Sequence, residues 1–561
     1  MIRAVPVLIG AVIALPVAAG LLGTLAASFG HLPALGFTGP SLDPWREFAT
    51  MPGLRRALWL SFSTGLAATL LALGAAMAAA AMLWHRAPGG WAGRALAPVL
   101  AAPHAAIAVG LAFLLAPSGW LFRLVSPWAT GWQRPPDIAT VNDAAGLALT
   151  LGLAIKELPF LLFVLLAALR QLPVAALVAE ARAMGYPAAL AWSRAILPQA
   201  YRMIRLPVFV TLAFAVSVVD MAILLGPSTP APLAVGVMRW MMAPDPARML
   251  PAAAGAVAML GLAGLAALAW RAGEAAAGAA LRHVAVAGRR RGAAGPALHL
   301  GAGAALALWS LGLATLAVLA LWSLAGRWRF PDPLPGDWSL AAWMHPGAGW
   351  GDPARATLVI GLAATLVSLG LAIAWLEAED RGAMPRAAWA TALAALPLLL
   401  PQVGFLYGVT ATSLAAGLPG GVVAVTWAHV LFVFPYVLIA LAGPWRALDP
   451  RLAASAASLG AGPARRLFSV KLPVLAAPLL AAAAIGFAVS VAQYLPTLLL
   501  GGGRVRTLTT EAVALASGVD RRLAAVTAIL QALLPMAGFA LAAALPARLF
   551  RHRRGLAGGG A

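Results

Sequence analysis

Long apolar runs separated by short polar segments dominate the hydrophobic pattern of the chain. A helix that crosses the hydrocarbon core of a bilayer needs about 20 apolar residues. Seven runs without a charged residue reach that length: 5–29, 57–83, 95–122, 249–270, 292–326, 356–376 and 523–547. The pattern therefore predicts membrane-spanning α-helices and excludes a soluble globular protein.

Other predicted spans contain a turn or ionisable residues. The uncharged stretch 387–445 is too long for one span, and the glycine-rich turn 417–421 divides it into two helices. Segments 147–169 and 207–226 are apolar apart from a few ionisable residues. With one more span after the second long loop, which ends at Pro473, we expect twelve spans, six in each half of the chain, and an all-α membrane fold.

Composition supports the membrane assignment and narrows the function. Of the 561 residues, 62% are hydrophobic and 10% are charged, and the net charge is +21. The basic residues are scattered between apolar spans, so the charge indicates no nucleic-acid partner, and the expected surroundings are a lipid bilayer. Because the chain has no cysteine, disulfides and thiolate metal sites are excluded.

The distribution of basic residues predicts the orientation of the spans. With the N-terminus inside, 24 of the 39 lie in inner segments, 14 lie in outer loops, and Lys156 lies within a span. Cytoplasmic loops retain an excess of basic residues, so both termini are expected in the cytoplasm. The first apolar run exceeds the about 7 to 15 residues of a signal peptide, and we expect it to remain as a helix.

An internal repeat divides the chain into two halves. Gly-Leu-Ala-Ala-Thr-Leu at 65–70 recurs at 361–366, and Ala-Val-Ser-Val at 215–218 recurs at 488–491. Two copies of a six-helix unit would enter the membrane from the same side, as parallel repeats, because six is an even number. The expected domains are 1–270 and 298–561, joined by a basic cytoplasmic linker at 271–297.

A cytoplasmic loop of roughly 30 residues separates the fourth and fifth spans of each half, whereas packed helices are usually joined by about 2 to 8 residues. In each loop an alanine-rich helix ends at a glycine, Gly185 or Gly460, and a proline soon afterwards opens a second, amphipathic helix. The glycine stands 13 residues before the proline of a Leu-Pro pair in both loops. This repeated helix, sharp turn and helix predicts an element that docks into a partner's groove.

The two loops resemble the coupling motif of the membrane subunits of binding-protein-dependent ABC importers, which reads Glu-Ala-Ala, three residues, Gly, nine residues, Ile-x-Leu-Pro. The first loop departs from it with Ala-Glu-Ala and a late Ile196, and the second has Ala-Ser-Ala, without the acid. The matching positions are Ala179, Glu180, Ala181, Gly185, Leu197, Pro198, Ala454, Ser455, Ala456, Gly460, Leu472 and Pro473.

The resemblance extends over essentially the whole chain. The paired halves are similar to the fused double permeases grouped with the thiamine and ferric-iron import systems. Segments 156–160, 225–230 and 493–497 resemble a thiamine-permease-like subgroup of unsettled substrate. This resemblance implies a multi-pass permease of a bacterial inner membrane that forms the solute path. It also implies two ATP-binding subunits on the loops inside and a solute-binding protein outside.

Other interpretations stay open from the sequence. The loops could be juxtamembrane helices that lie on the bilayer surface. A major-facilitator-type secondary transporter also has twelve helices in parallel repeats, but segment 83–90 lacks the aspartate of its usual signature. A membrane-embedded enzyme such as a glycan polymerase would want clustered acids in large outer loops, and Asp137 with Asp143 is the nearest such pair.

The chain is expected to have no enzymatic activity, cofactor or metal of its own. A P-loop needs Gly-Lys-Ser or Gly-Lys-Thr to hold the phosphates, and the two lysines follow Ile155 and Val470. No His-Glu-x-x-His or Gly-x-Ser-x-Gly motif is present, and His104 and His429 are expected to be structural. ATP hydrolysis is therefore expected on a separate subunit.

Polar residues within the spans are candidates for the solute path. Ionisable groups inside a bilayer usually face a cavity or a partner, and spans four and five contain Lys156, Glu157 and Asp220. They either line the path, or Asp220 is the counter-ion of Lys156 and locks the two spans together. Gln493 takes the place of Asp220 in the second half, so the path would be electrically asymmetric. An acidic lining in the first half would suit a cationic solute.

Overall fold

The structure is a computed structural model that describes residues 5–84, 91–290, 292–345, 349–382, 396–518 and 520–549. Within these residues the chain forms helices and no β-strand, so the expected all-α membrane fold is confirmed. Ten described helices are long and apolar enough to cross a bilayer. An eleventh span counts if residues 463–474 and 476–491, which meet at a bend of 79°, form one broken span.

Two of the ten spans each consist of two α-helices in succession, α5 with α6 and α9 with α10. The ten spans are α1 (Val5–Ser28), α3 (Leu54–Leu83), α5 (His104–Leu115) with α6 (Trp120–Val125), α7 (Leu147–Leu169), α9 (Ala188–Ala191) with α10 (Leu197–Ser217), α13 (Met249–Val286), α14 (Ala294–Leu324), α16 (Gly351–Asp380), α20 (Val422–Arg446) and α27 (Arg521–Leu549).

Prolines explain where the expected spans are broken. The run 95–122 is interrupted at Pro103, between α4 (Trp91–Ala101) and α5, because proline has no N–H to donate to the preceding turn. The expected ninth span begins outside the described residues, and its described part is α18 (Leu396–Leu399) and α19 (Gln402–Ala415), separated by Pro401. With 14 residues, α19 is too short to count as a complete span.

Several basic residues that were assigned to the cytoplasm are not among the residues that the structure describes. They are Arg3, Arg86, Arg291, Arg386, Arg551, Arg553 and Arg554. The orientation of the termini therefore stays a prediction from the sequence.

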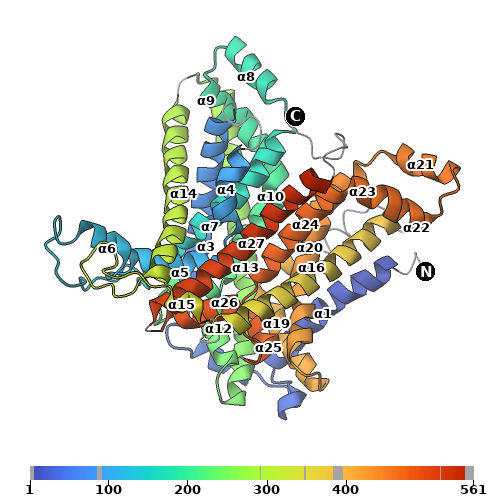
Figure 1. The fold of residues 1–561 in the computed structure, drawn as a ribbon. Coiled ribbons are helices and arrows are strands. Elements are labelled where there is room, and N and C mark those ends of the chain that lie inside the picture. Colours follow the sequence, from blue (N-terminus) through green and yellow to red (C-terminus); the bar gives the residue numbers. More distant parts are fainter. Residues whose placement is uncertain are drawn as a thin grey trace.

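The first helix of each expected half packs against the other half (Figure 1). α1 lies along α19, and α14 lies against α3, α5 and α7. Figure 1 also shows α8 (Val174–Ala183) and α21 (Pro450–Ser458) on the same side of the molecule, at its upper end, away from α12 (Leu233–Met241) and α25 (Leu495–Gly501). The two long loops of the sequence therefore emerge on one side.

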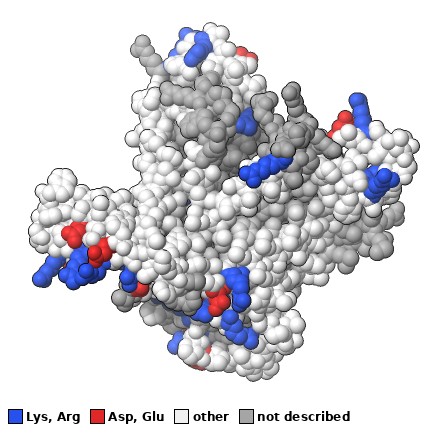
Figure 2. All heavy atoms as spheres, in the orientation of Figure 1, with Lys and Arg blue, Asp and Glu red and all other residues white. Residues whose placement is uncertain are grey.

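Charged side chains gather at the ends of the molecule (Figure 2). The flank between the ends is mostly uncharged in this view, whereas arginine, lysine, aspartate and glutamate mark the upper tips and the lower rim. An uncharged flank is what the hydrocarbon core of a bilayer requires, because a charge facing lipid costs a few kcal/mol on insertion scales.

Candidate coupling loops and intramembrane polar site

Both long loops form the expected helix, sharp turn and helix. α8 and α21 end just before Gly185 and Gly460, and each glycine has φ +80°. In the first loop the Gly185 amide donates to Arg182 O, and in the second the Gly460 amide donates to Ala457 O, both at 2.9 Å. With a second bond from the following residue, each turn is a Schellman motif, in which glycine avoids the Cβ penalty of the left-handed region.

A π-helical turn follows in both loops. We call the first loop, residues 174–198, loop A and the second, residues 450–473, loop B. In loop A, α9 passes through the π-turn η3 (Trp192–Ile196) directly into α10, which begins at Leu197 and Pro198. In loop B, α22 (Pro463–Arg466) passes through η6 (Leu467–Lys471) into α23, which begins at Leu472 and Pro473 and ends at Val474.

Only loop B is bent away from the span that follows it. Residues 463–474 meet α24 (Ala476–Val491) at 79°, whereas residues 188–217 of loop A and α10 form one continuous span. Pro478 explains the break, because it has no N–H for the carbonyl of Val474, four residues earlier. The corresponding residue of the first half, 275 positions earlier, is Met203, which keeps its amide hydrogen.

The loops also differ in burial. The second helix of loop A is covered, and Leu190, Trp192 and Ile196 are all buried. In loop B, α21 has no buried residue, Leu459 is 87% exposed and Phe468 is 66% exposed. Loop B thus presents apolar side chains, outside the long helices, that no described part of the chain covers.

Half of the twelve motif positions are exposed. Glu180 and Ser455 are both exposed, as are Ala179 and Ala454, whereas Ala181 and Leu197 are buried. The geometry therefore leaves one face of the first helix of each loop accessible.

Residues that follow α13 cover part of loop A. Arg194 Nη1 donates to the Arg289 carbonyl at 2.7 Å. The guanidinium carbons of Arg194 and Arg290 each lie 5.9 Å from the Tyr186 ring centroid, within cation–π range. The basic segment that the sequence identifies as a linker is therefore attached to loop A and not to loop B, among the described residues.

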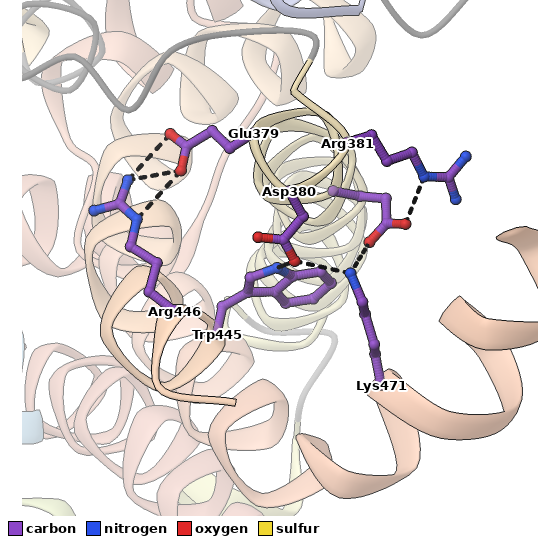
Figure 3. Close-up of polar contacts among 7 residues, drawn as sticks. Glu379, Asp380, Arg381, Trp445, Arg446 and Lys471 are labelled. Carbon is purple, nitrogen blue, oxygen red and sulfur yellow. Dashed lines mark hydrogen bonds and ion pairs between the residues drawn. The ribbon is translucent and has the colours of Figure 1, made fainter. Parts of the chain in front are cut away.

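Lys471, the last residue of η6, is held by two carboxylates at the C-terminal end of α16 (Figure 3). Its ammonium lies 2.7 Å from Glu377 Oε2 and 2.8 Å from Asp380 Oδ2, and the side chain is only 10% exposed. The Trp445 indole of α20 donates to the same Asp380 oxygen at 3.0 Å, and its ring centroid lies 5.5 Å from Lys471 Nζ. One lysine thus joins loop B to both α16 and α20.

Two arginines complete this cluster. The Arg446 guanidinium lies 2.9 Å from Glu379 Oε2 and joins α20 to α16. Arg381 Nε lies 2.7 Å from Glu377 Oε1, four residues earlier on the same helix. The sequence analysis missed this cluster, although its signal is visible: the charged run Glu377 to Arg381 directly follows an uncharged span.

Loop A is followed by a different polar cluster. Arg205 Nη2 lies 2.6 Å from Glu274 Oε2, and the Tyr201 hydroxyl donates to the same carboxylate. The Trp270 indole donates to the Tyr201 oxygen at 2.8 Å. These contacts join the start of α10 to α13.

Lys156 contacts the end of a helix and no acid. Its ammonium donates to Leu100 O at 2.7 Å and to Val99 O at 3.3 Å. Val99 O would ordinarily accept from residue 103, but Pro103 has no N–H, so the lysine supplies the missing donor. The positive charge also suits the C-terminal end of α4. Among the described residues Lys156 forms no ion pair with Asp220, which favours the path over the lock as the alternative for Asp220.

Glu157 connects three helices. One carboxylate oxygen is hydrogen-bonded to His104 Nε2 at 3.1 Å, and the other accepts from the Thr211 hydroxyl at 3.3 Å. The side chains come from α7, α5 and α10 respectively. The expectation that His104 makes a structural hydrogen bond is met, and Thr211 is a contact that the sequence did not suggest.

Asp220 and Gln493 occupy matching breaks between helices. Asp220 is not in the middle of a span as expected: α10 ends at Ser217, and Asp220 begins the short helix α11 (Asp220–Leu225). Gln493 lies between α24 and α25, and its buried Oε1 has no hydrogen-bond partner among the residues that the structure describes. Both side chains are buried, so each break places a polar group inside the membrane-spanning body.

His429 is the centre of a buried hydrogen-bonded chain in the second half. Its Nδ1 is 2.7 Å from Ser490 Oγ, and its Nε2 is 2.9 Å from Thr497 Oγ1. Because both ring nitrogens are used, His429 is structural, as expected. Groups of three or more histidine, aspartate or glutamate side chains that could hold a metal ion are absent from the described part of the chain.

Comparison with known proteins decides the family. The chain is 33% identical over 523 residues to the inner membrane ABC transporter permease protein YnjC of Escherichia coli, covering 92% of this chain and 93% of that protein. The chain belongs to the ABC transporter permease family. The permease is also 26% identical over 186 residues to the spermidine/putrescine transport system permease protein PotC homolog of Mycoplasma genitalium, covering 32% of this chain and 65% of that protein. No protein-family profile matches it.

Membership of this family settles several expectations. The permease is a multi-pass protein of the inner membrane, and it is a transport subunit and not an enzyme. ABC permeases work with ATP-binding subunits and solute-binding proteins. The relatives give no support to the major-facilitator alternative.

Proposed function

We propose that the permease is the membrane subunit of an importer and that loops A and B couple it to two cytoplasmic ATP-binding subunits. The observation that carries this proposal is loop B, where Leu459 and Phe468 are 87% and 66% exposed and both precede the bend before α24. Large exposed apolar side chains of this kind are typical of a surface that meets a protein partner. Loop A emerges on the same side, with its glycine turn in the same conformation.

The proposed topology and domain boundaries follow from this assignment. Both loops and both termini would be cytoplasmic, and a solute-binding protein would dock on the opposite side. Residues 1–270 and 298–561 would each form one six-helix unit, joined by 271–297. The matching π-turns η3 and η6, 275 residues apart, support this duplication.

We further propose that Glu157, Asp220 and Gln493 lie along the solute path. Two buried acids favour a cationic solute, which agrees with the spermidine and putrescine in the name of one relative. Lys156 has a structural role in this proposal, because it completes the hydrogen bonding of α4. We assign the permease to the thiamine- and ferric-iron-type group of double permeases on the basis of the sequence resemblance.

A copurification experiment tests the coupling role. The tagged permease is expressed with its ATP-binding subunit, and the amount of that subunit retained is measured. We expect Leu459→Asp and Phe468→Asp in loop B to reduce retention severalfold. Val423→Asp, at an 84% exposed apolar residue of α20 far along the chain from the loop, is the matched control. Full retention by the double loop variant would contradict the proposal.

A further inference from the structure

The two loops are connected to the membrane-spanning body in different ways. Loop A continues through η3 into α10 without a bend, so a displacement of the loop moves α10 directly. Loop B is separated from α24 by the bend of 79° at Leu475. A sharp bend is a poor lever, because movement on one side can be absorbed by further bending.

Lys471 provides loop B with another connection. Among the charged residues of loop B, Lys471 lies nearest the bend along the chain. Its ammonium contacts two acids of α16 at 2.7 and 2.8 Å. Charge-assisted hydrogen bonds of this length are strong and directional. Through Trp445 and Arg446 the same cluster includes α20 (Figure 3).

We propose that Lys471 is the positioning residue that transmits movement of loop B to α16 and α20. The inference rests on the proposed coupling role of the loops and adds that the two loops act on different helices. In the first half the corresponding position is Ile196, which is fully buried. No ionic connection is needed there, because the continuous helix already joins loop A to α10.

The contacts of Lys471 explain why this cluster can work as a connection. Glu377 and Asp380 of α16 both contact the Lys471 ammonium, whereas Glu379 is held by Arg446 of α20. Removing Lys471 takes away the two ion pairs that the described residues form between α16 and loop B. Loss of this one side chain is therefore expected to release the loop from α16 while the other cations still hold α20.

Distance measurements between spin labels test the proposal. The chain has no native cysteine, so labels at Leu459→Cys in loop B and Leu366→Cys on the exposed face of α16 report only these two sites. In the parental protein, alone in nanodiscs, we expect one narrow distance distribution. In Lys471→Met it should broaden severalfold, in Lys471→Gln it should broaden less, and in Lys471→Arg it should stay narrow.

Arg381→Gln is the matched control. It removes a cation from the same cluster, but Arg381 contacts an acid of its own helix and does not join the loop to anything, so the distribution should stay narrow. A parental distribution in both Lys471→Met and Lys471→Gln would overturn the proposal. Their presence in the membrane as monodisperse protein is checked first by size-exclusion chromatography.

A second arm uses the complex with its ATP-binding subunit. Addition of a non-hydrolysable ATP analogue should change the distance between labels on α16 and α20 in the parent, and this change should be lost in Lys471→Met although the subunit is still retained. An unchanged response would overturn the proposal. Failure of the parental protein itself to retain the subunit would contradict the proposed function, which separates the two conclusions.

Discussion

Gly408 lies so close to Gly20 that a Cβ atom on residue 408 would be 1.8 Å from the Gly20 carbonyl oxygen. The Gly408 amide also donates to Thr24 Oγ1 at 3.0 Å. In membranes, small residues allow helices to approach backbone to backbone, where dispersion and polar contacts hold them together. α1 and α19 are therefore joined along a surface that has no room for a side chain.

Substitution of Gly408 by valine is expected to separate these helices. Because neither backbone can yield without breaking its helix, we expect overpacking to cost about 1–3 kcal/mol of unfolding free energy. The measurement is thermal unfolding of the purified protein in detergent. Gly10→Val, on α1 with nothing within 4 Å of an added Cβ, is the control. Equal melting temperatures for the two variants would contradict the close contact.

The glycine turns of loops A and B should be sensitive to a β-branched residue. Gly185→Val and Gly460→Val force φ near +80° on valine, at a cost on the order of 1–3 kcal/mol that movement of the second helix would relieve. We expect each variant to retain less ATP-binding subunit and to hydrolyse less ATP in the complex, with the larger loss for Gly185.

Gly462→Val is the control for these variants. Gly462 is two residues from the turn of loop B, has φ −65°, and has nothing within 4 Å of an added Cβ. It should bind and couple like the parent. If the double Gly185 and Gly460 variant coupled ATP hydrolysis to uptake at the parental rate, the coupling role of both loops would be wrong.

Asp220 and Lys156 should behave as independent residues. Asp220→Asn is expected to reduce transport by the reconstituted complex while the amount of folded protein is unchanged. Lys156→Met removes the donor that completes α4, and we expect a loss of about 1–3 kcal/mol in unfolding free energy. In the double variant the two effects on stability should add to within about 0.5 kcal/mol. Rescue of Lys156→Met by Asp220→Asn would instead favour the ion pair.

The orientation of the membrane spans can be measured directly, since the chain has no cysteine that would give background labelling. Ser458→Cys in loop B should resist a membrane-impermeant maleimide in intact cells and react after permeabilisation. Asp137→Cys and Arg239→Cys, in loops expected outside, should react without permeabilisation. Labelling of residue 458 in intact cells would reverse the topology.

The sequence predicts elements whose determinants are local. The turns at Gly185 and Gly460 are predictable because the glycine and the proline that follows it determine the local backbone conformation. The breaks at Pro103 and Pro401 also have local causes. The hydrophobic pattern alone predicts one continuous span across each proline, because it does not register the missing N–H. The sequence suggested an acidic partner for Lys156 because its observed partners, the carbonyls of Leu100 and Val99, are backbone groups that no side-chain pattern reveals.

Contacts between distant segments are harder to predict. Glu377 and Lys471 are 94 residues apart, and only the packing of loop B against α16 brings them together. The contrast in burial between Trp192, which is buried, and the matching Leu467, which is partly exposed, is likewise tertiary, since both are apolar residues at the same place in a loop. The sequence indicates that these residues matter to the loops but not which surface they meet.

The contact between α1 and α19 also constrains how the protein is made. Thr24 and Gly408 are 384 residues apart, so at a synthesis rate of about 5–20 residues per second the first helix is inserted roughly 20 to 80 seconds before its main partner leaves the ribosome. During that time the glycine face of α1 is exposed to lipid or to the insertion machinery. A ribosome that stalled within the second half would leave this face permanently open, and such a chain would be a natural substrate for membrane quality-control proteases.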